Sequence, residues 1–216
     1  MREKVIAEIL RGKLIAIVRG MAEEQIVPIA EAISAGGISM LEVTFNQANP
    51  DSFASTARAI AAIRKSFGDA GYAGAGTVIT VQQLEMAAEA GAQYIIAPDA
   101  NPEIIRKTRE MGLVSIPGAM TPSECVMAHN AGADFVKLFP LGNLGAGYLK
   151  AIRAPLSHIK FLGVGGISEK NAAEYLAAGA VGFGVGGNLV NKEWIDAGRF
   201  DLITELATKY VNAVTS

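Results

Sequence analysis

Short apolar runs alternate along the chain with longer stretches in which apolar residues recur at helical spacing. The runs are too short for helices, and their composition is typical of buried strands. Five of them follow an Ala-rich helical stretch that closes on a glycine, the residue that most easily adopts the left-handed conformation at a helix end. Eight strands are predicted, at residues 14–18, 38–43, 72–75, 94–97, 113–116, 135–138, 159–164 and 181–185.

Helical patterns fill the gaps between these strands, at residues 23–34, 51–66, 81–89, 102–111, 122–130 and 169–178. Thr121 is expected to cap one helix, because a proline and then a glutamate follow it at the spacing of a capping box. Thr80 and Ser168 are expected to cap two others. The first ten residues alternate charged and apolar positions without the apolar block of a signal peptide, which predicts a short helix that caps the domain.

Eight strands alternating with helices in 216 residues predict one α/β domain, a (β/α)8 TIM barrel with an N-terminal capping helix that spans residues 1–216. An open doubly wound sheet is the alternative. No Gly-x-Gly-x-x-Gly follows the first predicted strand, which disfavours a dinucleotide-binding form of that sheet.

Charge and composition narrow the expected partners to small molecules. The net charge is −2 and no long run of one sign occurs, which disfavours nucleic acid and membrane surfaces. The single cysteine, Cys125, fits a buried thiol in a reducing cytoplasm. His129 and His158 fall at the end of the barrel away from the expected site, and no cluster has metal-ligand spacing. We therefore expect no metal or other cofactor.

Lys137 is the most unusual residue in the pattern, a lone cation within the apolar run 135–140. A strand that is apolar on both sides is normally buried on both faces. Burial of an unpaired ammonium is costly, so the pKa of Lys137 should fall towards neutral. A neutral amine in a dry pocket attacks carbonyl groups. The alternative is that Lys137 marks the end of its strand and extends into solvent.

Polar residues also break the apolar pattern near the carboxyl ends of other predicted strands, where barrel enzymes carry their chemistry. Glu42 would face solvent on an edge strand. A closed barrel has no edge, however, and its outward positions meet helices, so Glu42 is predicted to point inward. Thr77 either caps a turn or offers its hydroxyl to a ligand.

Glycine pairs follow the last two predicted strands, at residues 165–166 and 186–187. Glycine lets backbone N–H groups approach an anion closely, and this place in a barrel is the usual phosphate site. Ordinary tight turns would explain one pair. Two pairs in these positions predict a site for phosphate or another anion.

Six segments resemble the KDPG/KHG aldolases, a family of class I aldolases for 2-keto-3-deoxy-6-phosphogluconate and 4-hydroxy-2-oxoglutarate. The resemblance covers nearly the whole chain and rests on residues 15–19, 41–45, 74–78, 116–118, 136–140 and 164–167. It implies cleavage of a 2-keto-3-deoxy-6-phospho sugar acid to pyruvate and D-glyceraldehyde 3-phosphate, or of 4-hydroxy-2-oxoglutarate to pyruvate and glyoxylate. It also implies a homotrimer.

The resemblance assigns a role to each matched residue. Lys137 would form a Schiff base with the C2 ketone, and Glu42 would move protons during dehydration of the carbinolamine and cleavage of the C3–C4 bond. The substrate-binding residues that it implies are Arg19 at the pocket floor, Thr77 at the carboxylate, Pro98 and Phe139 at the walls, and Gly165, Gly166, Gly187 and Asn188 at the phosphate.

Four positions depart from the common pattern of the family. Asn46 stands where many members have an arginine that grips the carboxylate, so either Arg19 carries that charge alone or the carboxylate binds less tightly. Asn188 replaces a serine and changes the size of the phosphate site. Val164 replaces a threonine, which would relax the preference at C4 and admit the galactonate epimer. Asp99 would add a carboxylate near the mouth and repel anionic substrates.

Two other functions share some of these features. A phosphate-binding isomerase or epimerase would use the glycine pairs, but it needs paired carboxylates or a metal, and only Glu42 and Asp99 are candidates. A sugar-phosphate-binding barrel without catalysis would account for Asn46 and Asn188. The presence of both Lys137 and Glu42 favours the aldolase.

Overall fold

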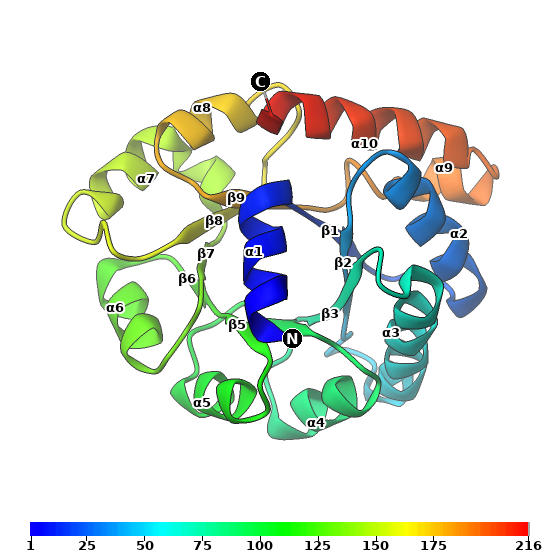
Figure 1. Ribbon diagram of the computed structural model, residues 1–216, viewed down its shortest axis with the longest axis horizontal. Coiled ribbons are helices and arrows are strands. Elements are labelled where there is room, and N and C mark those ends of the chain that lie inside the picture. Colours follow the sequence, from blue (N-terminus) through cyan, green and yellow to red (C-terminus); the bar gives the residue numbers. More distant parts are fainter. Residues whose placement is uncertain (216) are drawn as a thin grey trace.

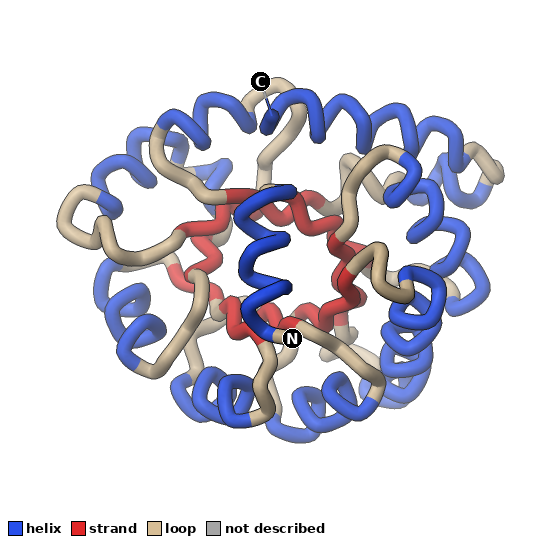
Figure 2. Tube along the Cα trace, in the orientation of Figure 1, coloured by secondary structure: helices blue, strands red, loops and turns tan. Residues whose placement is uncertain are grey.

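The computed structural model, which describes residues 1–215, contains one sheet of parallel strands in the order β5-β4-β3-β2-β1-β9-β8-β7-β6. The strands form a ring about a common centre (Figure 2). Their bounds are β1 Leu14–Val18, β2 Met40–Thr44, β3 Tyr72–Gly76, β4 Tyr94–Ile96, β5 Val114–Ile116, β6 Gly118–Ala119, β7 Val136–Leu138, β8 Phe161–Val164 and β9 Gly182–Val185. The predicted barrel is confirmed, and the doubly wound alternative is wrong.

The fifth predicted strand continues past its expected end at residue 116. Pro117 interrupts it and divides it into β5 and β6. Proline has no N–H to give to a ladder. Its carbonyl still accepts a hydrogen bond of 2.8 Å from the backbone N–H of Lys137. The interruption therefore leaves β6 paired with β7, in register Gly118 to Lys137, and the ring nearly closes at this point.

Helices surround the ring of strands, and α1 lies across one end of it (Figure 1). Their bounds are α1 Arg2–Gly12, α2 Glu23–Ala35, α3 Phe53–Phe67, α4 Val81–Glu89, α5 Pro102–Glu110, α6 Pro122–Asn130, α7 Gly145–Arg153, α8 Ala172–Ala177, α9 Lys192–Asp196 and α10 Phe200–Thr215, with short 3-10 turns η1 Pro50–Ser52 and η2 Leu141–Asn143. The outer core lies between these helices and the sheet.

Local signals in the sequence set most helix ends. Thr80 and Thr121 both form the capping boxes expected of them. Five glycines that follow helices have φ between +74° and +106°, in the left-handed region where a side chain would be strained. They are Gly37, Gly91, Gly112, Gly132 and Gly179.

The expectation that Ser168 caps the eighth helix is wrong, since α8 begins only at Ala172. The reason is a competing turn in which Asn171 Oδ1 accepts a hydrogen bond of 2.8 Å from the Ser168 N–H. Asn171 Nδ2 donates to the carbonyl of Gly166 at 2.9 Å. The Asn171 side chain therefore stabilises the loop after β8, and the helix begins only after this loop.

Apolar side chains fill the end of the barrel that α1 covers. Val5 and Ile9 of α1 belong to one apolar cluster with Tyr94 of β4, Leu162 of β8 and Phe135, which directly precedes β7. The predicted capping helix is therefore confirmed, and it closes the end of the barrel where the strands begin (Figure 1). A ligand must enter from the opposite end.

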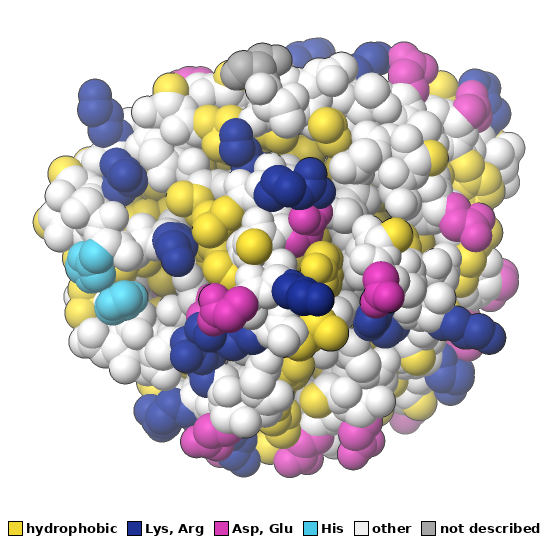
Figure 3. Space-filling view, viewed as in Figure 1, with side chains coloured by type: hydrophobic (Ala, Val, Ile, Leu, Met, Phe, Trp, Pro, Cys, Tyr) yellow, Lys and Arg dark blue, Asp and Glu magenta, His cyan; other side chains and the backbone are white. Residues whose placement is uncertain are grey.

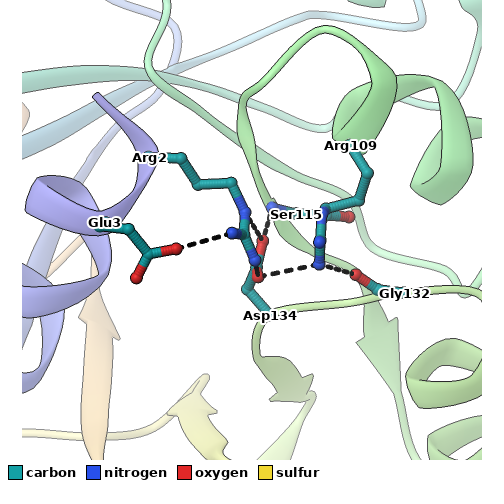
Figure 4. A network of polar contacts seen from close by, with 6 residues as sticks. All are labelled: Arg2, Glu3, Arg109, Ser115, Gly132 and Asp134. Carbon is teal, nitrogen blue, oxygen red and sulfur yellow. Dashed lines mark hydrogen bonds and ion pairs between the residues drawn. The ribbon is translucent and has the colours of Figure 1, made fainter.

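Asp134 anchors α1 to the body of the barrel (Figure 4). Its nearly buried carboxylate forms ion pairs with Arg2 of α1 and with Arg109 of α5, the latter at 3.1 Å. The same carboxylate accepts a hydrogen bond of 3.0 Å from the backbone N–H of Ser115 in β5. Because Asp134 lies two residues before Val136, the first residue of β7, this network also fixes the approach to the strand that carries Lys137.

Figure 3 shows basic and acidic side chains of both signs on the face that carries α1, with the two histidines side by side at its edge. The rings of His129 and His158 meet edge to face, 4.8 Å apart, away from the open end of the barrel. Cys125 is buried, as expected. Within residues 1–215, no helix combines the length and apolar character needed to cross a bilayer.

Candidate active site

A cavity of about 830 Å³ opens at the carboxyl ends of the strands. All ten residues that the sequence singled out as site residues line it. Glu42 and Lys137 come from β2 and β7, and the other eight come from the loops that follow the strands. The structure thus gathers into one pocket side chains that lie up to 169 positions apart, from Arg19 to Asn188.

Lys137 lies in the middle of β7, and only 8% of its surface is exposed. Its Nζ lies 5.0 Å from the centre of the Phe139 ring. Burial lowers the pKa of the Lys137 ammonium, the nearby Glu42 carboxylate opposes that shift, and the Arg19 charge adds to it. The predicted burial is confirmed, and the alternative of a lysine reaching bulk solvent is wrong.

Glu42 points into the barrel, as predicted, and is 1% exposed. Burial raises the pKa of its carboxyl to about 7, against the opposing effects of the Lys137 and Arg19 charges. A β-carbon on the neighbouring Gly76 would lie only 2.6 Å from Glu42 Oε2. The absence of a side chain at Gly76 is therefore what gives the carboxyl its space.

Arg19 and Thr77 meet at one side of the cavity, where Arg19 Nη2 donates a hydrogen bond of 3.3 Å to Thr77 Oγ1. Thr77 has φ of +57°, a left-handed conformation that is rare for a β-branched residue. Such strain persists where the surrounding structure imposes it, and it is concentrated at functional sites. The neighbouring Thr80 caps the helix that follows, so Thr77 remains available to a ligand.

The loops after β8 and β9 form the glycine-rich side of the cavity. Gly165 and Gly166 have φ of +87° and +75°, and a β-carbon on Gly166 would lie 3.0 Å from the Cα of Gly142. The loop is held from behind, because Gly142 N–H donates to the carbonyl of Gly165 at 2.7 Å. Gly187 and Asn188 of the second loop lie across the same cavity. Backbone groups at such glycines can face an anion.

Two of the four unusual positions lie outside this cavity. Asp99 is exposed and borders a separate small cleft, so its carboxylate does not line the cavity. The reason is the alternation of side chains after β4, which places Pro98 in the cavity and Asp99 away from it. Asn46 borders an adjoining groove, where its Oδ1 accepts a hydrogen bond of 3.1 Å from the N–H of Ala48.

Several cavity residues were not predicted from the sequence, including Ile17, Met21, Ile167, Val190 and Lys192. The apolar ones gave no signal, because they resemble ordinary core positions. Lys192 begins α9, four positions after Asn188, and forms an ion pair of 2.5 Å with Asp196. Its position just after the second glycine loop was the available signal for a further cation near an anion site.

The fold and the cavity define a barrel enzyme of the aldolase class. The family model described as "Aldolase: KDPG and KHG aldolase" matches residues 5–206, and the chain belongs to this family of carbon–carbon lyases.

Similar proteins agree with this membership. A probable 2-dehydro-3-deoxy-6-phosphogalactonate aldolase of Rhizobium meliloti is 38% identical over 82% of this chain and 81% of its own length. A 2-dehydro-3-deoxy-phosphogluconate aldolase of Treponema pallidum is 36% identical over 94% of both chains. The crystal structure of Legionella pneumophila KDPG aldolase, with pyruvate captured as a covalent carbinolamine, superposes with a TM-score of 0.84 at 33% identity, covering 94% of this chain and 96% of that one.

Proposed function

We propose that this protein is a class I aldolase that cleaves a 2-keto-3-deoxy-6-phospho sugar acid to pyruvate and D-glyceraldehyde 3-phosphate through a Schiff base on Lys137. The observation that carries the proposal is a lysine with a lowered pKa, buried in the same cavity as a carboxyl whose pKa is about 7. The first group is suited to attack on a ketone, and the second to proton transfer in both directions near neutral pH.

The reaction begins when the neutral Lys137 amine adds to the C2 ketone. The protonated Glu42 carboxyl then gives its proton to the departing hydroxyl, so that the carbinolamine loses water and becomes an iminium. The Glu42 carboxylate next accepts the proton of the C4 hydroxyl while the C3–C4 bond breaks. The bonding electrons flow into the iminium and leave a neutral enamine. Glu42 returns its proton to C3 of the enamine, and water hydrolyses the resulting iminium to pyruvate and the free Lys137 amine.

The remaining cavity residues bind the two ends of the substrate. Arg19 and Thr77, joined by a hydrogen bond, hold the carboxylate next to the ketone. Pro98 and Phe139 form the walls. The distal phosphate lies against the backbone of Gly165, Gly166 and Gly187 and the amide of Asn188, with the Lys192 ammonium at the same side of the cavity.

The range of substrates depends on Val164 in the cavity wall, which is buried and offers no hydroxyl. An apolar group there discriminates weakly between epimers at C4, which supports use of the galactonate as well as the gluconate phosphate, and of 4-hydroxy-2-oxoglutarate in addition. Proteins similar to this chain carry all three names. Pyruvate release from each of the three compounds, at matched concentrations, measures the preference.

We also propose a cytoplasmic homotrimer. Three exposed apolar side chains offer a surface that association would cover, Met120 in the turn after β6 and Val126 and Met127 of α6. The buried, unpaired Cys125 suits a reducing compartment. Sedimentation equilibrium of the wild type and of a Val126→Asp variant tests the trimer, because a trimer built on this surface should dissociate in the variant.

Borohydride reduction in the presence of pyruvate tests the proposed mechanism. Reduction should fix one pyruvate-derived mass on the peptide that contains Lys137, and Lys137→Ala should lose both the adduct and turnover. Lys160→Ala is the matched control, because Lys160 also lies over a phenylalanine ring, at 5.7 Å from Phe135, but outside the cavity. A wild-type protein that releases pyruvate without any adduct at Lys137 would contradict the mechanism.

A further inference from the structure

Two buried side-chain polar atoms lack a hydrogen-bond partner among residues 1–215, Oε2 of Glu42 and the hydroxyl of Tyr94. Both residues are almost completely removed from solvent, at 1% and 0% exposure. Nearly all buried polar groups in folded proteins are paired, either with protein atoms or with ordered water. Two unpaired groups in one barrel interior therefore require a common explanation.

The two residues lie in one row across the inside of the sheet. Glu42 of β2 is in register with Gly74 of β3, and Gly74 is in register with Tyr94 of β4. Side chains in register on parallel strands point to the same face. Glu42 and Tyr94 therefore face the barrel interior on either side of a residue without a side chain.

Glycines of β3 make room for both groups. A β-carbon on Gly74 would lie 2.2 Å from the Tyr94 ring, and one on Gly76 would lie 2.6 Å from Glu42 Oε2. The ring thus covers one glycine of β3 and the carboxyl covers the next inward glycine. Inward positions on one strand are about 7 Å apart, and the Tyr94 ring and the Glu42 carboxyl reach over them from the strands on either side, so that internal water can join their polar atoms.

The chemistry of the pair fixes the direction of the hydrogen bond. Burial, and to a smaller extent the Glu42 charge, raise the pKa of the Tyr94 hydroxyl well above its ordinary value. The phenol therefore stays neutral and keeps its proton. Because an ionised carboxylate can only accept hydrogen bonds, Tyr94 must be on the donating side.

We propose that Tyr94 is a positioning residue for the reaction, whose hydroxyl donates through one internal water molecule to Oε2 of Glu42. This link holds the carboxyl from behind and stabilises its ionised form, the form that accepts the proton of the C4 hydroxyl. The inference rests on the role proposed above for Glu42.

Tyr94→Phe tests the link, because it removes one oxygen and keeps the ring that packs over Gly74. Loss of a donor to the ionised form should raise the pKa of Glu42 by about one pH unit. Carbon-13 NMR of carboxyl-labelled protein measures that pKa directly, with Glu42→Gln identifying the signal. The rate of cleavage at neutral pH should fall about three- to tenfold, with KM unchanged. In a Glu42→Gln background, Tyr94→Phe should have little further effect.

Tyr72→Phe is the matched control, since it removes a phenol hydroxyl from β3 at the strand end nearer α1. It should leave the Glu42 titration and the rate unchanged. An unchanged Glu42 titration in folded Tyr94→Phe protein would overturn the inference, whether or not the enzyme is active. Failure of the proposed function would be recognised differently, because the wild type would then release no pyruvate and form no adduct. The NMR titration of Glu42 would still be measurable in that case.

Discussion

Lys137 and Glu42 act on each other inside the barrel in opposite senses. Burial lowers the pKa of the Lys137 ammonium and raises the pKa of the Glu42 carboxyl, and the charge of each residue partly reverses the shift of the other. The balance favours the uncharged form of both groups more than water would. Burial therefore brings both groups nearer the uncharged forms that addition of an amine to a ketone requires, and the charge of each residue limits the shift of the other.

Replacement of Glu42 by glutamine should separate adduct formation from proton transfer. The amide keeps the size of the side chain but cannot accept or deliver a proton. We expect turnover to fall on the order of 100-fold or more, while pyruvate still forms some adduct with Lys137. Single-turnover kinetics combined with borohydride trapping measures both quantities. A fully active Glu42→Gln protein would remove Glu42 from the mechanism.

The raised pKa of Glu42 also predicts how stability depends on pH. Between the ordinary value of 4.5 and about 7, the folded protein binds a proton at Glu42 that the unfolded chain has released. The free energy of unfolding should therefore fall as pH rises through this window, by at most on the order of 3 kcal/mol from this one group. Urea unfolding of the wild type and of Glu42→Gln at pH 5 and pH 8 measures the effect. The advantage of Glu42→Gln should grow with pH, and a constant difference would contradict the shift.

Substitution of Gly76 by alanine should disturb the site through its shape alone. The added methyl would lie 2.6 Å from Glu42 Oε2 and 2.9 Å from Thr44 Cγ2, so the carboxyl must move. We expect turnover to fall about tenfold or more and the free energy of unfolding to fall by roughly 1–3 kcal/mol. Gly147→Ala is the control, because nothing lies within 4 Å of its added methyl in α7. That change should keep full activity and slightly raise stability.

Removal of the Asp134 charge should weaken the attachment of α1 and the start of β7. Asp134→Asn leaves Arg2 and Arg109 without their shared carboxylate. Because the Asp134 side chain is only 4% exposed, we expect the free energy of unfolding to fall by about 1–3 kcal/mol, measured by urea denaturation. Asp201→Asn, which breaks an exposed pair with Arg199, should leave the denaturation midpoint nearly unchanged. Equal effects of the two substitutions would show that the Asp134 network stabilises the fold no more than an exposed ion pair does.

Lys192 should contribute to binding of the phosphate end. Lys192→Ala should raise KM for a phosphorylated keto acid about three- to tenfold and leave KM for 4-hydroxy-2-oxoglutarate unchanged. The effect should shrink at high salt, because the lysine is 68% exposed. Lys209→Ala removes a similar exposed lysine, paired with Glu205 on α10, and should change neither constant. A uniform rise in KM for both substrates would assign Lys192 a general effect on the cavity instead.

Much of the fold was predictable because its signals are local. Strand runs, helix-ending glycines and the caps at Thr80 and Thr121 each depend on a few neighbouring residues. Lys137 was recognisable because its neighbours in sequence are apolar, and that is also why it is buried. Glu42 required the additional step that a barrel has no edge.

The features that the sequence did not predict depend on residues distant in the chain or on fine geometry. Asn171 competes with Ser168 for the loop after β8 through a side-chain turn that no spacing rule singles out. Asp99 and Pro98 are adjacent in sequence, yet only one of them faces the cavity. Tyr94 looks like any buried aromatic residue until the strand register places it in one row with Glu42.

The seal formed by α1 across the barrel has a consequence for the order of events in turnover. Because apolar side chains fill that end, the cavity described within residues 1–215 opens at the opposite end of the barrel, and reactants and products pass through that opening. The fragment still bonded to Lys137 sits deepest, and the aldehyde fragment lies between it and the exit. The aldehyde must therefore depart first, and the three-carbon keto acid is the last product to leave. This keto acid should then inhibit competitively with respect to the substrate when it accumulates.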